Sequence, residues 1–180
     1  MEIIKTPIPD VLIIKPKVFE DARGYFYESY NAGMLLQHGI DANFVQDNQS
    51  LSQKDVLRGL HFQNPPYTQG KLVRVIKGAV LDVVVDIRKN SPTYGQHFDI
   101  ELSEKNKIQL WVPPGFAHGF VTLENDTIFS YKCTNYYNKA AEDCILWNDT
   151  DIAINWNVSS PLLSEKDKSG KPFKIFESQF

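Results

Sequence analysis

The sequence has few of the residues that build covalent or metal-bound frameworks. Its 180 residues include two cysteines, Cys133 and Cys144, and four histidines. Two cysteines make neither a disulfide framework nor a zinc site, and their use fits a reducing cytosol, so we expect a cytoplasmic protein. The histidines have no spacing suited to a three-ligand metal site. The sequence therefore predicts no resident metal.

No apolar run approaches membrane-spanning length, and the N-terminal residues MEIIKTPIPDV lack the basic and apolar regions of a signal peptide. A formal net charge of −3 argues against non-specific binding of nucleic acid, so an anionic ligand would need locally placed arginines and lysines. The sequence also lacks repeats, low-complexity tracts and linkers. We expect one domain over residues 1–180, with neither membrane nor nucleic acid as a partner.

Short runs of β-branched and aromatic residues, separated by turn residues, predict many strands. The expected strands cover residues 11–18, 25–30, 44–50, 56–62, 71–76, 78–87, 97–102, 109–112 and 127–133, with a further strand opening from the turn at 113–120. Asn31 can cap a short helix that Gly39 ends, and residues 140–148 allow a helical turn. The pattern predicts an all-β sandwich or barrel with a few short peripheral helices, and sites in its mouth or interior.

The stretch 56–78, VLRGLHFQNPPYTQGKLVRVIKG, is the strongest candidate for chemistry. We expect its two strands to form a hairpin that brings His61 and Lys71 together. Arg58 and His61 would face opposite sides of a regular strand, but Gly59 could host a bulge that re-aims one of them. A single histidine in a strand is more often structural than catalytic, and a single lysine is more often solvated. The cluster of bases favours a function.

Three further patterns leave alternatives open. Gln46 and Asn48 have the same parity in a strand, so they can face one pocket or form a polar edge. Ser164-x-x-Asp167 fits a capping box at the start of a helix. Tyr131 shares a face with Phe129, as a core aromatic residue would.

The spacing Pro113-x-Gly115-x-x-His118 resembles the second motif of the cupin superfamily, the jelly roll or double-stranded β-helix barrel. The first cupin motif would supply His-x-His as metal ligands, whereas Gly59-Leu60-His61-Phe62-Gln63 holds one histidine. The resemblance therefore points to a metal-free cupin.

A longer series of motifs resembles the dTDP-4-dehydrorhamnose 3,5-epimerase family over nearly the whole chain. In order, the motifs are Asp21-x-Arg23-Gly-x-Phe26, Arg58-Gly-Leu-His61, Gln69-Gly-Lys71-Leu-Val-Arg74, Pro114-Gly-Phe-Ala-His118-Gly-Phe, Tyr131-Lys-x-Thr-x-Tyr136-Tyr137 and Leu163-Ser-x-Lys166-Asp167. The resemblance implies cofactor-independent epimerisation at C3 and C5 of dTDP-4-dehydro-6-deoxy-D-glucose, giving dTDP-4-dehydro-L-rhamnose for dTDP-L-rhamnose and polysaccharide biosynthesis.

Such an epimerase needs a base on one face of the sugar, an acid on the other, and a cation at the C4 oxygen where enolate charge develops. By resemblance, His61 is the base and Asp167 fixes its tautomer. Lys71 stabilises the enolate, and Tyr131 is the acid.

The resemblance also implies the residues that bind the substrate. Arginines and lysines suit a pyrophosphate, and Tyr137 would stack on the thymine ring. The full set of implied contacts is Arg23, Phe26, Glu28, Gln46, Asp47, Asn48, Arg58, His118, Tyr137, Glu142 and Lys166. Family members are homodimers that share strands, so residues near Arg23 can reach the partner's site.

Other functions remain possible on this scaffold. One is a mono-epimerase or a sugar 3,4-ketoisomerase, which would keep His61 but differ around the tyrosine and lysine. Another is a non-catalytic cupin that binds sugar nucleotides, which would not need His61, Asp167 and Tyr131 together. A third is a metal-dependent cupin oxygenase or isomerase.

Overall fold

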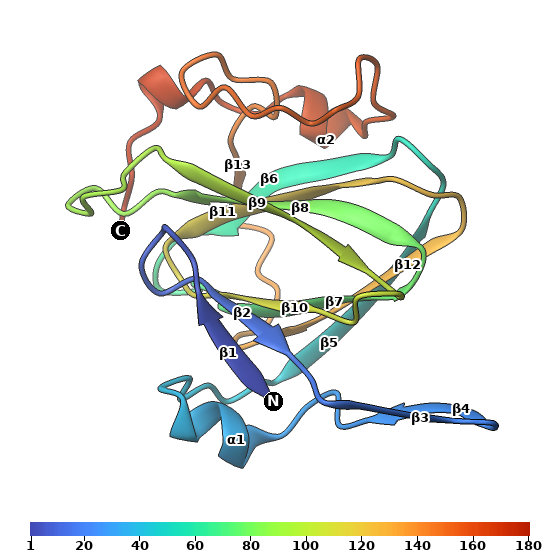
Figure 1. Cartoon of the computed structure of the whole chain (residues 1–180). Coiled ribbons are helices and arrows are strands. Elements are labelled where there is room, and N and C mark those ends of the chain that lie inside the picture. The colour runs from blue at the N-terminus through green and yellow to red at the C-terminus, as the bar shows by residue number, and fades with distance from the viewer.

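The computed structural model describes residues 1–180, and its body is formed by two antiparallel sheets packed face to face (Figure 1). The six-stranded sheet runs in the order β1 (Glu2–Lys5), β2 (Leu12–Lys15), β10 (Gln109–Val112), β7 (Lys71–Lys77), β12 (Thr127–Cys133) and β5 (Gln46–Ser52). The five-stranded sheet runs in the order β13 (Glu142–Cys144), β6 (Leu57–Gln63), β11 (Phe116–Thr122), β8 (Ala79–Asp86) and β9 (His97–Ser103). The predicted all-β class is confirmed.

The helices are short and peripheral, as expected. They are α1 (Ala32–Gln37), α2 (Glu165–Lys168) and the 3₁₀ turn η1 (Phe173–Ile175). The side chain of Asn31 accepts a hydrogen bond from the amide of Met34 and so caps α1, and Gly39 follows its end at a positive φ. No helix is long and apolar enough to cross a membrane.

The main core lies between the two sheets. Val80 and Val84 of β8 point into it and meet residues of the opposite sheet such as Val73 and Phe129. The alternate residues of β8 point outward into a second core, which the C-terminal segment covers with Ile152, Trp156 and Phe176 among others. Figure 1 shows this segment, coloured orange to red, over the outer side of the five-stranded sheet. Because both faces of β8 are covered, all of its residues are buried, as predicted for a central strand.

A third, smaller core lies on the outer face of the six-stranded sheet. Leu35 of α1 and Ile40 after it pack there against Ile14, Leu72 and Trp111. The helix thus covers part of this sheet face.

Three details differ from the predicted elements. The strand predicted at 11–18 divides into β2 and β3 (Val18–Asp21), with Pro16, which has no N–H to donate, in the break. β3 pairs with β4 (Gly24–Tyr27) in a hairpin that projects away from the barrel (Figure 1). The helical turn predicted at 140–148 is wrong, because β13 pairs with β6 there.

The hairpin predicted for residues 56–76 is also wrong. β6 and β7 do not pair: β6 lies between β13 and β11 in one sheet, and β7 lies between β10 and β12 in the other. The link through Asn64–Gly70 therefore crosses from one sheet to the other. His61 and Lys71 still face the same space, but from opposite walls.

Candidate active site

A cavity of about 420 Å³ opens between the two sheets, and a smaller one of about 180 Å³ lies deeper. The two share His61 from one sheet and Lys71 and Tyr131 from the other. The outer cavity is lined by Gln46, Asn48, Gln49, His61, Phe62, Gln63, Gln69, Lys71, Tyr131, Tyr137 and Glu142. The inner one adds Ser50, Arg58, His118, Phe120 and Phe129. All four predicted catalytic residues lie in these walls or directly behind them.

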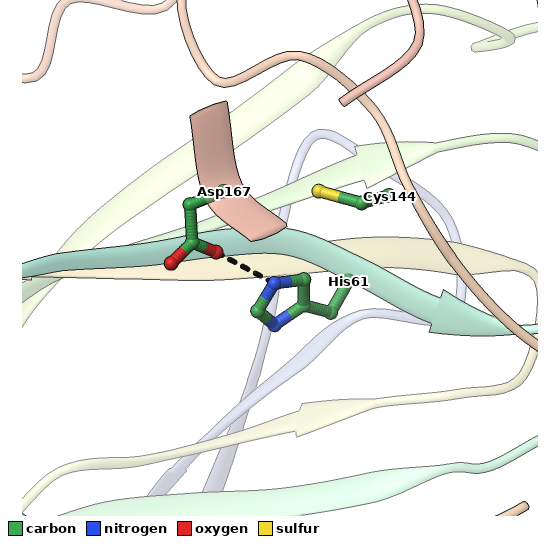
Figure 2. Close-up of side chains that lie close together, drawn as sticks. All are labelled: His61, Cys144 and Asp167. Atoms are coloured by element: carbon green, nitrogen blue, oxygen red, sulfur yellow. Dashed lines mark ion pairs between the residues drawn. The ribbon is translucent and has the colours of Figure 1, made fainter. Parts of the chain in front are cut away.

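Asp167 lies behind His61 in an almost fully buried position. Its Oδ1 is 2.7 Å from Nε2 of His61, as Figure 2 shows, and also accepts a hydrogen bond of 3.1 Å from the amide of Gly59. Its Oδ2 accepts one of 2.5 Å from the hydroxyl of Ser164. Burial alone would raise the pKa of Asp167. The contacts with His61, Ser164 and Gly59 outweigh burial and bring this pKa down to about 2. The carboxylate is therefore charged at neutral pH.

The capping box predicted at Asp167 is confirmed, and the structure also places its carboxylate against His61. Ser164 and Asp167 form the capping box of α2, in which the hydroxyl of Ser164 also accepts from the amide of Asp167. One carboxylate thus caps a helix with one oxygen and contacts His61 with the other.

His61 carries a ring that can accept a proton. Burial lowers the pKa of its imidazole; Asp167 opposes this, while Lys166 and Lys71 add to it. The ring is therefore neutral at neutral pH. Because Oδ1 of Asp167 lies 2.7 Å from Nε2, the carboxylate favours the tautomer with its proton on Nε2. In that tautomer Nδ1 keeps a free lone pair, as a general base requires.

Lys71 and Tyr131 face the cavity from adjacent strands of the other sheet. Burial lowers the pKa of the Lys71 ammonium, partly opposed by Cys133 and Asp82, and Lys71 makes no ion pair within the chain. Burial, with Cys133 nearby, raises the pKa of the Tyr131 phenol, which therefore carries its proton at neutral pH. Tyr131 also packs against Phe129, with ring centroids 6.0 Å apart, so its core role and its place in the cavity are compatible.

Four of the predicted binding residues meet at the mouth of the cavity. Tyr137 donates its hydroxyl proton to Glu142 over 3.0 Å, and Glu142 forms an ion pair with Lys166. The side chain of Gln46 accepts from the amide of Tyr137 over 2.9 Å. Asn48, deeper on the same face of β5, accepts a hydrogen bond of 3.1 Å from Gln46, so these two residues line a pocket rather than a polar edge.

The bulge predicted at Gly59 is present. The register between β6 and β11 shifts there, so that His118 pairs with His61 but Phe120 pairs with Arg58. Gly59 packs so closely on Gly119 that a Cβ on Gly59 would lie 2.6 Å from the Cα of Gly119. The extra residue brings Arg58 and His61 to the same cavity, as the bulge was expected to do.

His118 reaches the inner cavity but is largely engaged elsewhere. It is buried, and its Nε2 lies 3.0 Å from both carboxylate oxygens of the fully buried Asp82. Arg58 is freer, since its guanidinium donates only to the hydroxyl of Ser52.

The structure leaves four predicted binding residues outside this site. Arg23 and Phe26 lie on the projecting β3–β4 hairpin, where Arg23 pairs with Asp21 at 2.6 Å and Phe26 is 71% exposed. Glu28 follows the hairpin and accepts from Asn31. Asp47 points outward, opposite in parity to Gln46, and pairs with Lys132 at 2.9 Å.

The sequence interpretation missed several residues of the cavity wall. Gln63 donates to the carbonyls of Tyr67 and Tyr136 and accepts from the amide of Asn138, so it fixes two loops at the mouth. Its parity with His61 in one strand was an available signal. The other missed wall residues are Gln49, Ser50, Phe62, Gln69, Phe120 and Phe129.

Cys144 lies next to the pair, and the ligand atoms of His61, Cys144 and Asp167 fall within 4.8 Å of one another (Figure 2). A metal would bind the thiolate, but burial raises the pKa of Cys144 to about 12, and its thiol donates to the carbonyl of Ile145. Both oxygens of Asp167 already accept hydrogen bonds. The donor set therefore fits a close histidine–carboxylate pair better than a metal centre.

Comparisons with known proteins show which family this chain resembles. A family model described as dTDP-4-dehydrorhamnose 3,5-epimerase matches residues 5–174. The enzyme of that name from Shigella flexneri is 55% identical over 174 residues, which are 96% of each chain.

Two solved structures are also similar. The dTDP-4-dehydrorhamnose 3,5-epimerase of Elizabethkingia anophelis superposes with a TM-score of 0.92 at 50% identity, covering 97% of each chain. The Legionella pneumophila dTDP-6-deoxy-D-glucose-3,5-epimerase, in complex with dTDP-4-keto-L-rhamnose, has a TM-score of 0.94 at 48% identity, covering 98% of this chain and 94% of the other. These neighbours have the cupin-type fold, so the predicted jelly roll is confirmed.

Proposed function

This chain belongs to the dTDP-4-dehydrorhamnose 3,5-epimerase family, and from that premise we propose that it converts dTDP-4-dehydro-6-deoxy-D-glucose into dTDP-4-dehydro-L-rhamnose. The reaction inverts C3 and C5 of the sugar and is a step of dTDP-L-rhamnose biosynthesis. The observation that carries the assignment to this site is the presence of a neutral histidine and a protonated tyrosine on opposite walls of one cavity.

The C4 ketone of the substrate acidifies the C–H bonds at C3 and C5. In the proposed mechanism Nδ1 of His61 removes one of these protons, and the electron pair moves onto the C4 oxygen. Asp167 stabilises the imidazolium that forms. The unpaired ammonium of Lys71 stabilises the enolate.

Tyr131 then gives its phenolic proton to the carbon from the opposite side, which inverts the centre. The phenolate regains a proton from solvent, and His61 releases the one it took. The same cycle at the second carbon completes the reaction. Two inversions need no oxidant, reductant or external electron acceptor, which fits a cofactor-independent enzyme.

The mouth of the cavity suits the nucleotide. Tyr137 offers an exposed ring for stacking on thymine, with Gln46 and Asn48 beside it. Lys166, which pairs with Glu142 at the mouth, and Arg58, in the wall of the inner cavity, supply cationic donors for the pyrophosphate. Glu142 and His118 complete the proposed contacts within the chain.

We assign Arg23, Phe26, Glu28 and Asp47 to the substrate site through a homodimer or a local rearrangement. The β3–β4 hairpin exposes Phe19, Tyr25 and Phe26, each more than half accessible. Such a run of aromatic surface on a projecting element suits burial against a second copy of the chain. The proposed cytoplasmic location follows from the nucleotide-sugar substrate and the free cysteines.

Deuterium incorporation tests the function. The protein is incubated with dTDP-4-dehydro-6-deoxy-D-glucose in heavy water. The product is trapped by reducing the ketone, and its mass is measured by mass spectrometry. Two deuterons with inverted C3 and C5 are expected. One deuteron would instead indicate a mono-epimerase or a ketoisomerase, according to its position, and none with tight dTDP binding would indicate a binding protein.

A further inference from the structure

The carboxylate of Asp167 is held by hydrogen bonds from Ser164 at the start of α2. The hydroxyl and the amide of Ser164 both donate to Oδ2 of Asp167, over 2.5 and 3.3 Å. With Oδ2 fixed, Oδ1 is left for Nε2 of His61 and the amide of Gly59. The hydrogen bonds from Ser164 therefore set the rotation of the carboxylate group that meets the imidazole.

The segment around α2 is anchored to the five-stranded sheet on both sides of the helix. Before α2, Leu162 forms a parallel bridge with Val56, the residue just before β6. After α2, Lys171 forms a second bridge with Ile145, just after β13. These anchors place the helix over β6 as a whole, but they leave the side-chain torsions of Asp167 free. Ser164 supplies the missing restraint.

We propose that Ser164 is a positioning residue of the epimerase reaction, acting through Asp167 to fix the tautomer and orientation of His61. The inference rests on the proposed function, since it gives Ser164 a task in the same reaction. Its hydroxyl does not touch the substrate. Its effect reaches the sugar only through the carboxylate and the imidazole.

Ser164 also caps α2, and its backbone permits a variant that separates the two roles. Its φ of −74° and ψ of 162° are extended and suit any residue. Glycine is a tolerated N-cap, almost as favourable as serine. Ser164→Gly therefore keeps the start of the helix and removes the hydroxyl from Asp167. Ser164→Thr keeps both the cap and the hydroxyl.

We expect Ser164→Gly to lower kcat about 10-fold, the size typical of removing a hydrogen-bonded support behind a functional side chain, with KM for the sugar nucleotide unchanged. Ser164→Thr should keep the wild-type kcat. Ser169→Ala is the matched control, because Ser169 donates only to a backbone carbonyl at the other end of α2. A Ser164→Gly enzyme with the wild-type kcat, or an equal loss in Ser169→Ala, would overturn the proposal.

A second readout does not depend on turnover. Titration of the His61 imidazole by NMR of ¹⁵N-histidine-labelled protein, assigned with a His61→Asn sample, reports the pair directly. Asp167 opposes the effect of burial on His61. If loss of the Ser164 hydroxyl lets the carboxylate turn away from the imidazole, the titration should move to lower pH in Ser164→Gly and not in Ser164→Thr. Identical titrations in all three proteins would contradict the inference. Failure of the wild-type protein to turn over the sugar would contradict only the proposed function.

That titration has to be interpreted with all the groups around the ring. Those that face or adjoin His61 are Asp167 and Lys166 from α2, Lys71 from β7, Tyr131 from β12, His118 from β11, Glu142 and Cys144 from β13, and Arg58 from β6. Ser164→Gly changes the direct surroundings of Asp167 alone among these, so the comparison isolates the carboxylate.

Discussion

Lys71 and His61 face one cavity from opposite sheets, ten positions apart in the chain but on strands that do not pair. The link between them turns across the barrel rather than back along one sheet. This arrangement places a buried lysine opposite a histidine with room for a ligand between the walls. A hairpin would have set the two side chains side by side.

Replacing His61 should abolish the chemistry and spare binding. His61→Asn removes the ring but leaves an amide that can still donate to Asp167. Loss of a general base typically costs 10²- to 10⁴-fold, so we expect solvent deuterium exchange to fall by roughly that factor. Calorimetric binding of dTDP should stay at the wild-type affinity. Exchange at the wild-type rate would show that another residue is the base.

Tyr131→Phe should separate proton removal from inversion. The phenylalanine keeps the packing against Phe129 but cannot deliver a proton from the far side. We expect deuterium to enter the recovered substrate while the formation of inverted product falls about 10²-fold. Product stereochemistry and rate equal to those of the wild type would remove Tyr131 from the mechanism.

The pH dependence of kcat/KM should be bell-shaped. Burial lowers the pKa of His61 from its ordinary value of 6.5, so the acidic limb, where the base becomes protonated, should lie below pH 6.5. Burial also lowers the pKa of Lys71 from 10.5, so loss of its charge should set an alkaline limb below pH 10.5. The pKa of Tyr131 is raised from 10.0, so loss of its proton would add to the alkaline limb only at higher pH.

Lys71→Arg provides the control for the alkaline limb. An arginine stays charged, so any activity that it retains should persist to higher pH. An unchanged alkaline limb in this variant would assign that limb to another group.

Asp167 should make the protein sensitive to acid. Its pKa falls from 3.8 to about 2 on folding, so its contribution to the free energy of unfolding is fully present above about pH 4 and is lost as the pH falls towards 2. The contribution is about 2 kcal/mol. Urea unfolding between pH 4 and 2 should show a smaller loss of stability in Asp167→Asn than in the wild type. Glu165→Gln, an exposed neighbour on α2, should behave as the wild type, and equal slopes in all three proteins would refute the assignment.

The proposed dimer can be tested by mixing two defective variants. Arg23→Ala should weaken the binding of the sugar nucleotide, and His61→Asn should be inactive. If the hairpin of one chain completes the site of the other, unfolding and refolding the two together restores one intact site in each mixed dimer. Activity of the mixture above the sum of its parts is the expected result. No gain from co-refolded variants that are shown to be dimeric would place Arg23 outside the partner's site.

Local patterns predicted the strands well. The bounds of β10 and β12 agree with the sequence because each has a compact β-type run between clear breakers. β13 was missed because Ala140-Ala141-Glu142 favours a helix by composition, whereas pairing with β6 decides its structure. Periodicity also does not say which sheet a strand joins, and so the link between β6 and β7 was misjudged.

In the candidate site, too, local features could be predicted from the sequence and long-range contacts could not. The parity of Gln46 and Asn48 and the bulge at Gly59 were visible in the sequence, because each depends on a few neighbouring residues. The double role of Asp167 was visible only as two competing alternatives, since a local motif cannot reveal a partner from a distant strand. That Arg23 lies away from His61 within one chain depends on how the hairpin projects, which no local pattern encodes.

The contact between Gly59 and Gly119 has a consequence for engineering this enzyme. A side chain at Gly59 would meet the backbone of Gly119, and one at Gly119 would come within 2.8 Å of the carbonyl oxygen of Arg58. Because backbone forms both obstacles, a second substitution elsewhere cannot make room. In a saturation library both positions should return only glycine. Attempts to change the substrate range of this enzyme should therefore leave the contact between Gly59 and Gly119 unchanged and be directed at other positions of the cavity wall.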